Sequence, residues 1–185
     1  MGDGAINYRR FLDGDDDGIV EIIREYKDGL ILYLNGYVDN IWVAEELVEE
    51  TFFRIVTKKP KFSGRSTFKT WLYSIGRNVA LDCLRKRKRV DVRSVEDSEK
   101  IIGEGRSFEK EYLEQERKIV LYKAMQNIPA NDRRVLHLKF FEGFTIAEIA
   151  LIIGKSVAQV NALMRKAKQA LKEELERGGF EYEEL

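Results

Sequence analysis

Two helix-start signals lie close together in the last third of the chain, and they constrain its local fold more tightly than any other feature. Thr145-Ile-Ala-Glu148 and Ser156-Val-Ala-Gln159 each place a hydroxyl residue three positions before an acid or amide, which is the capping-box pattern. Gly154, between them, suits the left-handed conformation that ends a helix. We therefore expect residues 145–175 to form two amphipathic helices joined by a tight turn, which is the helix-turn-helix geometry.

The second of these helices has a polar and basic side that suits duplex DNA. In a helix-turn-helix, the second helix enters the major groove with its N-terminal residues towards the base edges. The candidate recognition residues are Ser156, Gln159, Asn161, Ala162, Arg165, Lys166 and Lys168. Its other side is expected to be buried through Val157, Val160, Met164, Ala167 and Leu171. Taken alone, a capped helical hairpin with a solvated basic face explains this segment equally well.

The rest of the chain has helical periodicity as well. Apolar residues recur at helical spacing over residues 19–38, 43–55 and 68–89, and again after residue 108. Only 2 of the 185 residues are proline. We therefore expect an all-α fold with two small helical domains, residues 1–90 and 109–185. Residues 91–108 are polar, mostly acidic and contain two glycines, so they are predicted to form a flexible acidic linker.

Charge and cysteine content limit the class of protein further. The 32 lysines and arginines balance the 32 aspartates and glutamates, so a surface that binds nucleic acid must be local. The single cysteine, Cys83, fits a reducing compartment. Neither a signal peptide nor an apolar run long enough to span a bilayer is visible. We expect a cytoplasmic protein.

Sequence patterns that would indicate an enzyme or a metal protein are missing. Asp13-Gly-Asp-Asp-Asp-Gly18 imitates the start of a calcium loop, but the twelfth position is Arg24, where a bidentate glutamate is needed. We interpret this acidic run as an N-cap for the first helix. With 1 histidine and 1 cysteine far apart, no metal-ligand cluster can be assembled from them. We expect no catalytic residue, no metal site and no cofactor.

Three segments together carry a family resemblance. They are Phe62-Ser-Gly-Arg-Ser-Thr-Phe-Lys-Thr-Trp71 with its continuation to Arg89, Ala44-Glu-Glu-Leu-Val-Glu-Glu-Thr-Phe52, and Ile128-Pro-Ala-Asn-Asp-Arg133 through Leu171. These resemble the promoter-melting segment, the polymerase-binding helix and the upstream-promoter domain of extracytoplasmic-function (ECF) sigma factors of the sigma-70 superfamily. The order and spacing match over nearly the whole chain. The resemblance implies a factor that binds core RNA polymerase and directs initiation through the −10 and −35 promoter elements.

The resemblance assigns the acidic helix near residue 48 to the polymerase. An apolar strip edged with carboxylates suits packing on a basic partner helix, and the family's partner there is the clamp helices of the largest polymerase subunit. The implied residues are Glu45, Glu46, Leu47, Val48, Glu49, Phe52 and Phe53. Glu46 and Glu49 stand where the family usually has Asp and Gln. The alternative is a core helix with an outward acidic face.

The resemblance also assigns the loop before residue 68, and the aromatic helix after it, to the −10 element. A small-residue loop can receive an unstacked base, and stacking on aromatic faces contributes roughly 1–3 kcal/mol per base. The implied residues are Phe62, Gly64, Ser66, Trp71 and Asn78. For Trp71, ordinary core packing is the favoured alternative. An asparagine inside a helix is unfavourable, which indicates a hydrogen-bonding task for Asn78.

A run of cations ends the same helix. Arg85, Lys86, Arg87, Lys88 and Arg89 are five consecutive basic residues that can neutralise DNA phosphates and release counterions. The alternative is a solvated helix end, where cations favour the negative pole of the helix dipole. Because five exceed what a cap needs, we favour phosphate contact.

The recognition helix departs from the family in one place. Val160-Asn-Ala-Leu163 stands where the family commonly has Val-Lys-Ser-Arg. Either the −35 element is unusual, with Asn161 contacting adenine, or this domain binds DNA weakly. The alternatives to a sigma factor are therefore a sigma-like helix-turn-helix regulator and a polymerase-binding scaffold with weak promoter reading.

Further partners follow from the resemblance alone. The family contacts the beta flap of the polymerase as well as the clamp helices. Its members are usually held inactive by a cognate anti-sigma factor, which is often membrane-bound. We expect these partners and promoter DNA, and no small-molecule substrate.

Overall fold

The computed structural model describes residues 3–91, 121 and 124–177, and its regular elements there are all helical. They are α1 (Asp3–Leu12), α2 (Asp17–Val38), α3 (Ile41–Lys58), α4 (Phe68–Asp91), α6 (Ala130–Leu136), the π-helical turn η1 (His137–Phe141), α7 (Ile146–Ile153) and α8 (Val157–Arg177). The predicted all-α fold is confirmed. Apart from Asp91, the predicted linker at 91–108 lies outside the described residues.

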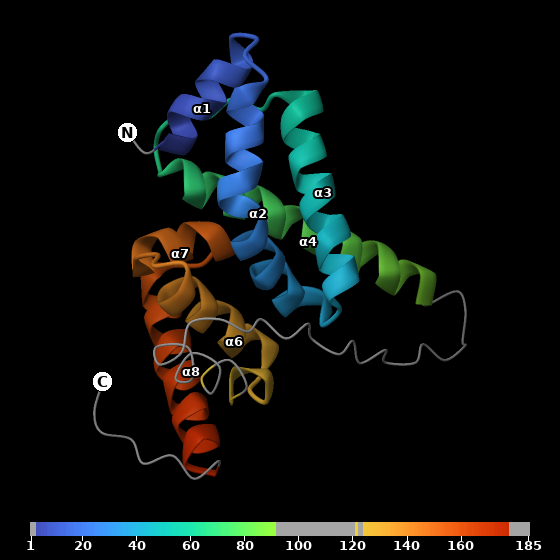
Figure 1. The fold of residues 1–185 in the computed structure, drawn as a ribbon. Coiled ribbons are helices and arrows are strands. Elements are labelled where there is room, and N and C mark those ends of the chain that lie inside the picture. Colours follow the sequence, from blue (N-terminus) through green and yellow to red (C-terminus); the bar gives the residue numbers. More distant parts are fainter. Residues whose placement is uncertain (1–2, 92–120, 122–123, 178–185) are drawn as a thin grey trace, which may run out of the picture.

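The first half is a bundle in which α1, α2 and α3 lie together and α4 crosses them (Figure 1). Its core is closed by fully buried aliphatic side chains from α2, α3 and α4, among them Ile22, Leu30, Ile55 and Leu72. Asn40 begins α3, because its side chain accepts hydrogen bonds from the backbone N–H groups of Trp42 and Val43. This half positions α3, α4 and the loop between them, which carry the residues assigned to the polymerase and the −10 element.

The acidic run at residues 13–18 caps α2, which is the first helix that the sequence predicted. The sequence did not identify α1, which precedes this run. Asp15 Oδ1 accepts the backbone N–H of Asp17 at 3.1 Å, and Arg10 Nε donates to Asp15 Oδ2 at 2.8 Å. Asp16, at the N-cap position, makes no side-chain cap. The expected acidic cap therefore exists, but it is made by Asp15 and begins α2.

The second half contains the predicted helix-turn-helix. Thr145 and Glu148 form a complete capping box at the start of α7, and Gly154 ends α7 with a left-handed φ of 64°. Ser156 N–H donates to Gln159 Oε1 at 2.9 Å, and Gln159 N–H donates to Ser156 Oγ at 3.2 Å. The axes of α7 and α8 are bent by 102°, within the range of this motif. Local capping chemistry alone was sufficient to predict it.

One residue of α8 lies differently from its prediction. Val160, Met164, Ala167 and Leu171 are buried as expected, but Val157 is 49% exposed. Val157 is the first residue of α8 and precedes its first buried residue, Val160, by three positions. Its side chain therefore belongs to the solvent-facing side of α8.

Among the described helices, none is by itself long and apolar enough to cross a membrane. The α7–α8 pair meets the length and composition criteria only when its two strongly bent members are taken together.

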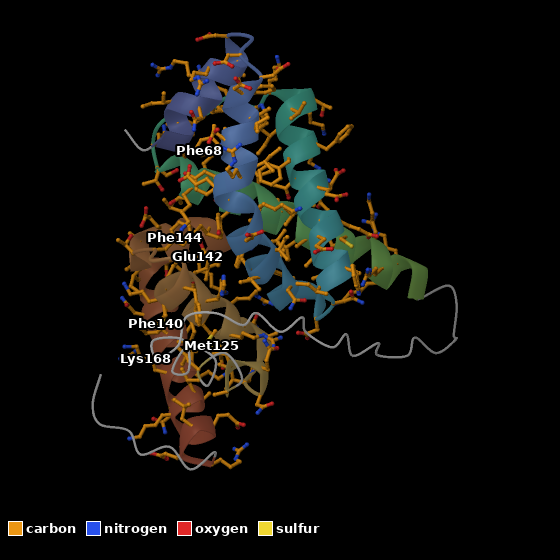
Figure 2. All side chains as sticks on the ribbon, in the orientation of Figure 1. Phe68, Met125, Phe140, Glu142, Phe144 and Lys168 are labelled. Atoms are coloured by element: carbon orange, nitrogen blue, oxygen red, sulfur yellow. The ribbon has the colours of Figure 1, made fainter. Side chains whose placement is uncertain are left out.

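The two halves meet where α7 packs on α4 and α6 packs near α2 (Figure 1). Glu142, in the turn before α7, is the centre of this contact, and Figure 2 shows it beside Phe144 at the boundary. The Tyr73 hydroxyl donates to Glu142 Oε2 at 2.6 Å, and Lys69 Nζ lies 2.9 Å from the same oxygen. Lys69 also donates to the Glu142 carbonyl at 2.8 Å. The rings of Tyr73 and Phe144 pack with centroids 5.1 Å apart.

The Glu142 carboxylate is held in its charged form at this contact. Burial by itself would raise its pKa, but the contacts with His137, Tyr73 and Lys69 outweigh burial and lower the pKa to about 2. His137 Nε2 lies 3.3 Å from Glu142 Oε1. A negative charge that is nearly buried therefore joins the two halves.

Two further sets of contacts join the two halves of the chain. Glu148 Oε1 accepts hydrogen bonds from the hydroxyls of Thr67 and Thr70, each at 3.2 Å. In the second set, Arg134 donates to the carbonyl of Gly36 at 2.6 Å, and its guanidinium lies 4.0 Å from the ring centroid of Tyr37. The first set joins the second half to the start of α4, and the second set joins it to α2.

Candidate polymerase and promoter interfaces

The residues assigned to the polymerase divide into a buried and an exposed group. Leu47, Val48 and Phe52 are 5%, 1% and 6% exposed and belong to the core of the first half. For these three, the alternative of a core helix holds, because a partner cannot reach them in the folded domain. Glu45 is half-buried, whereas Glu46, Glu49 and Phe53 lie on the surface.

Trp42, which the sequence pattern did not single out, completes the exposed side of α3. Trp42 and Phe53 are each 62% exposed. With Glu46 and Glu49 they follow the spacing i, i+4, i+7 and i+11, so all four lie on one side of the helix. We call Trp42, Glu46, Glu49 and Phe53 the α3 strip. The spacing is visible in the sequence. Apolar residues such as Phe52 stand directly beside members of the strip, however, so the sequence alone does not show which of them are buried.

The residues assigned to the −10 element lie around an aromatic cluster. Phe62 packs with ring centroids 5.6 Å from Phe68 and 5.3 Å from Trp71, and Tyr8 lies 5.2 Å from Trp71. The Tyr8 hydroxyl donates to the Pro60 carbonyl at 2.7 Å, and burial raises the pKa of Tyr8 to about 12. Trp71 is half-buried in this cluster, so the packing alternative describes much of its surface.

The other assigned residues lie beside the cluster. Gly64 has a φ of 71°, and a Cβ built there would meet nothing within 4 Å, so the loop is open at this point. Ser66 Oγ donates to the Thr67 carbonyl at 3.2 Å. Asn78 is exposed and follows Trp71 by two helical turns, so both lie on one side of α4. The structure thus brings Phe62 and Trp71 into contact, with Asn78 farther along the same side.

The basic end of α4 is fully on the surface. Arg85, Lys86, Arg87, Lys88 and Arg89 are all exposed. Arg85 Nη1 pairs with Asp82 Oδ1 at 2.7 Å, and Arg54 contacts the other Asp82 oxygen at 3.3 Å. Asp82 therefore offsets part of the charge at the start of the run.

All seven candidate recognition residues, Ser156 just before α8 and six on it, are exposed, but several have other partners. Ser156 and Gln159 bond to each other in the second capping box. Lys166 Nζ lies 3.4 Å from the buried carboxylate of Asp132. Lys168 Nζ lies 5.6 Å from the ring centroid of Phe140, and both are labelled in the second half in Figure 2. Leu163, which follows Ala162, is half-buried against the core and does not belong to the exposed side.

Comparison with known proteins assigns both halves to one family. The family model of sigma-70 region 2 matches residues 22–90, and the family model of sigma-70 region 4 matches residues 118–171. A helical bundle followed by a helix-turn-helix domain is thus the architecture of a transcription initiation factor. The chain belongs to the ECF sigma factors of the sigma-70 family. Its role is that of an RNA polymerase sigma factor, which directs promoter-specific initiation, as the sequence predicted.

Individual relatives are similar over most of their length. The chain is 26% identical over 170 residues to the ECF RNA polymerase sigma factor SigW of Bacillus subtilis, covering 88% of this chain and 91% of SigW. It is 27% identical over 172 residues to the RNA polymerase sigma-H factor of Pseudomonas aeruginosa, covering 88% and 89%.

Solved structures share the fold. CnrH in complex with the cytosolic domain of CnrY superposes with a TM-score of 0.65 at 18% identity, covering 95% of this chain and 99% of CnrH. RpoE in complex with the anti-sigma factor NepR, from Bartonella quintana, also gives 0.65, at 23% identity, covering 84% and 97%.

Proposed function

We propose that this sigma factor binds core RNA polymerase through the α3 strip. The observation that carries the assignment is the exposure of Trp42 and Phe53 on either side of Glu46 and Glu49. Two large apolar groups held on a rigid helix give a partner its anchors, and the carboxylates between them suit a basic partner helix. The clamp helices of the largest polymerase subunit are the partner proposed for this strip.

Promoter contacts are divided between α4 and α8. The aromatic cluster at Phe62 and Trp71 supports stacking of a −10 base, with Asn78 and the open loop at Gly64 and Ser66 beside it. The basic residues 85–89 contact phosphates, and the exposed side of α8 reads the −35 element. No residue is assigned a catalytic role, and among the described residues no group of His, Cys, Asp and Glu side chains could hold a metal ion.

A protein partner restrains this activity. Two similar structures are complexes, one with the cytosolic domain of CnrY and one with the anti-sigma factor NepR. By the same likeness of fold, this chain is held by a cognate anti-sigma factor in the cytoplasm, and the beta flap of the polymerase contacts its second half.

Reconstitution with core polymerase tests the proposal. Trp42→Ala with Phe53→Ala should weaken binding to core polymerase about tenfold or more, because exposed aromatic anchors dominate such interfaces. Val20→Ala is the control, since Val20 is a 47% exposed apolar residue on α2 and not a member of the strip. Unchanged binding of the double variant would overturn the role of the α3 strip.

The same experiment separates the alternatives to a promoter-reading sigma factor. A wild-type chain that binds polymerase but starts transcription from no member of a promoter library would be a scaffold. One that binds duplex DNA and not polymerase would be an independent helix-turn-helix regulator.

A further inference from the structure

We infer that α8 reads an A·T-rich upstream element, with Asn161 contacting adenine and the side chains of Val157, Ala158 and Ala162 contacting thymine methyl groups. This inference rests on the proposed function and assigns the bases recognised by its −35 surface.

Exposure selects these residues. Val157 is 49% exposed, and Ala158, Asn161 and Ala162 are all on the surface. Val157 and Asn161 are four residues apart, as are Ala158 and Ala162, so the four lie on one side of the first turns of α8. This is the part of a recognition helix that points at base edges.

Internal contacts remove the neighbouring candidates from base reading. The Gln159 side-chain oxygen accepts the Ser156 N–H at 2.9 Å, so the bidentate pairing that a glutamine makes with adenine would break the cap of α8. Leu163 packs half-buried against the core. The Asn161 amide makes no hydrogen bond to another of the described residues that would compete with a base.

The chemistry of these side chains matches A·T pairs. Asparagine pairs bidentately with adenine N6 and N7, and apolar groups contact the thymine methyl. Arginine or lysine is the commonest reader of guanine, and the first cation within α8 is Arg165, beyond Ala162. The three apolar side chains therefore favour thymine over cytosine, which has no methyl group.

The length of the surface sets the length of the element. At about 1.5 Å of rise per residue, Val157 to Ala162 span roughly 7.5 Å of helix axis. Two to three base pairs at ~3.4 Å each occupy that length. The A·T-rich part should therefore be short, with Arg165 and Lys168 meeting phosphates beyond it.

Modified bases test this with the full-length chain in its complex with core polymerase. Initiation is first selected from a library with a randomised upstream element, which should return adenine flanked by thymine. Replacing a selected thymine by uracil removes one methyl group and should reduce initiation about threefold to fivefold, the effect of one lost apolar carbon. Replacing adenine by 7-deazaadenine removes N7 and should reduce it about tenfold.

Variants connect each base to its residue. Val157→Ala should abolish the response to uracil at one position, and Asn161→Ala should abolish the response to 7-deazaadenine. Glu176→Ala, an exposed change near the end of α8, is the control and should keep both responses. Two outcomes would overturn this inference and leave the proposed function intact. One is promoter-selective initiation that neither modified base changes, and the other is a selected element rich in G·C. Failure of the wild-type holoenzyme on every library member would overturn the proposed function with it.

Discussion

The hydroxyl of Tyr73, on α4, donates a 2.6 Å hydrogen bond to the carboxylate of Glu142 in the second half of the chain. Burial and the nearby carboxylate raise the pKa of Tyr73 well above its usual range, so the hydroxyl keeps its proton and remains a donor. Glu142 is the acceptor and carries the charge. The Glu142 carboxylate thus joins α4 to the second half of the chain, beside the contacts that Glu148 and Arg134 make between the halves.

Glu142→Gln should loosen this contact. The amide keeps the shape of the side chain but removes the charge that pairs with Lys69 at 2.9 Å. Charge-assisted hydrogen bonds contribute about 1.5–3 kcal/mol, so a loss of that order in the free energy of unfolding is expected. Urea unfolding measures it. Glu176→Gln, at an exposed position, should change stability by less than about 0.5 kcal/mol. Equal stability of both variants would contradict the prediction.

Because the Glu142 carboxylate is charged in the folded chain, we expect the free energy of unfolding to depend on pH. The pKa of Glu142 is lowered from 4.5 to about 2, so its ionised form stabilises the folded chain. That contribution is fully present above pH ~4.5 and is lost as the pH falls towards 2. The stability difference between wild type and Glu142→Gln should therefore be constant from pH 8 to 5 and shrink below it. A difference that grows on acidification would contradict this direction.

Helices α1 and α2 approach each other closely at Gly18, so a larger residue there should destabilise the fold. A Cβ built on Gly18 would lie 2.3 Å from the carbonyl oxygen of Asn7 and 2.8 Å from the backbone nitrogen of Phe11. Because both atoms belong to the backbone, α1 has to move. Gly18→Ala should cost about 1–3 kcal/mol, although alanine favours helix elsewhere. Thermal unfolding measures it, with the exposed Asp13→Ala as control. Increased stability of Gly18→Ala would contradict the close approach.

Local chemistry was predictable from the sequence, and contacts between distant segments were not. The capping boxes of α7 and α8 need only residues three apart, so their pattern predicted both helix starts. Tyr73 and Glu142 are 69 residues apart, and no local pattern relates them. In α3, the adjacent residues Phe52 and Phe53 are 6% and 62% exposed. Only packing against the neighbouring helices decides which of two such residues is buried.

The basic residues at the end of α4 should contribute unequally to the salt dependence of DNA binding. Each phosphate contact on duplex DNA contributes about 0.9 to the slope of log affinity against log salt concentration. Arg85 is already paired with Asp82 at 2.7 Å, so it has less charge to offer than the cations after it. Arg87→Ala with Lys88→Ala should therefore reduce the slope of promoter binding by about 2, and Arg85→Ala by less than 1.

Promoter binding by the holoenzyme, titrated from low to moderate salt, measures these slopes. Asp82→Asn is the matched control, because it frees Arg85 without removing a cation and should raise the contribution of Arg85. If the slope stays unchanged in Arg87→Ala with Lys88→Ala, these cations form a solvated helix end, where charge stabilises α4 through its dipole and contacts no phosphate.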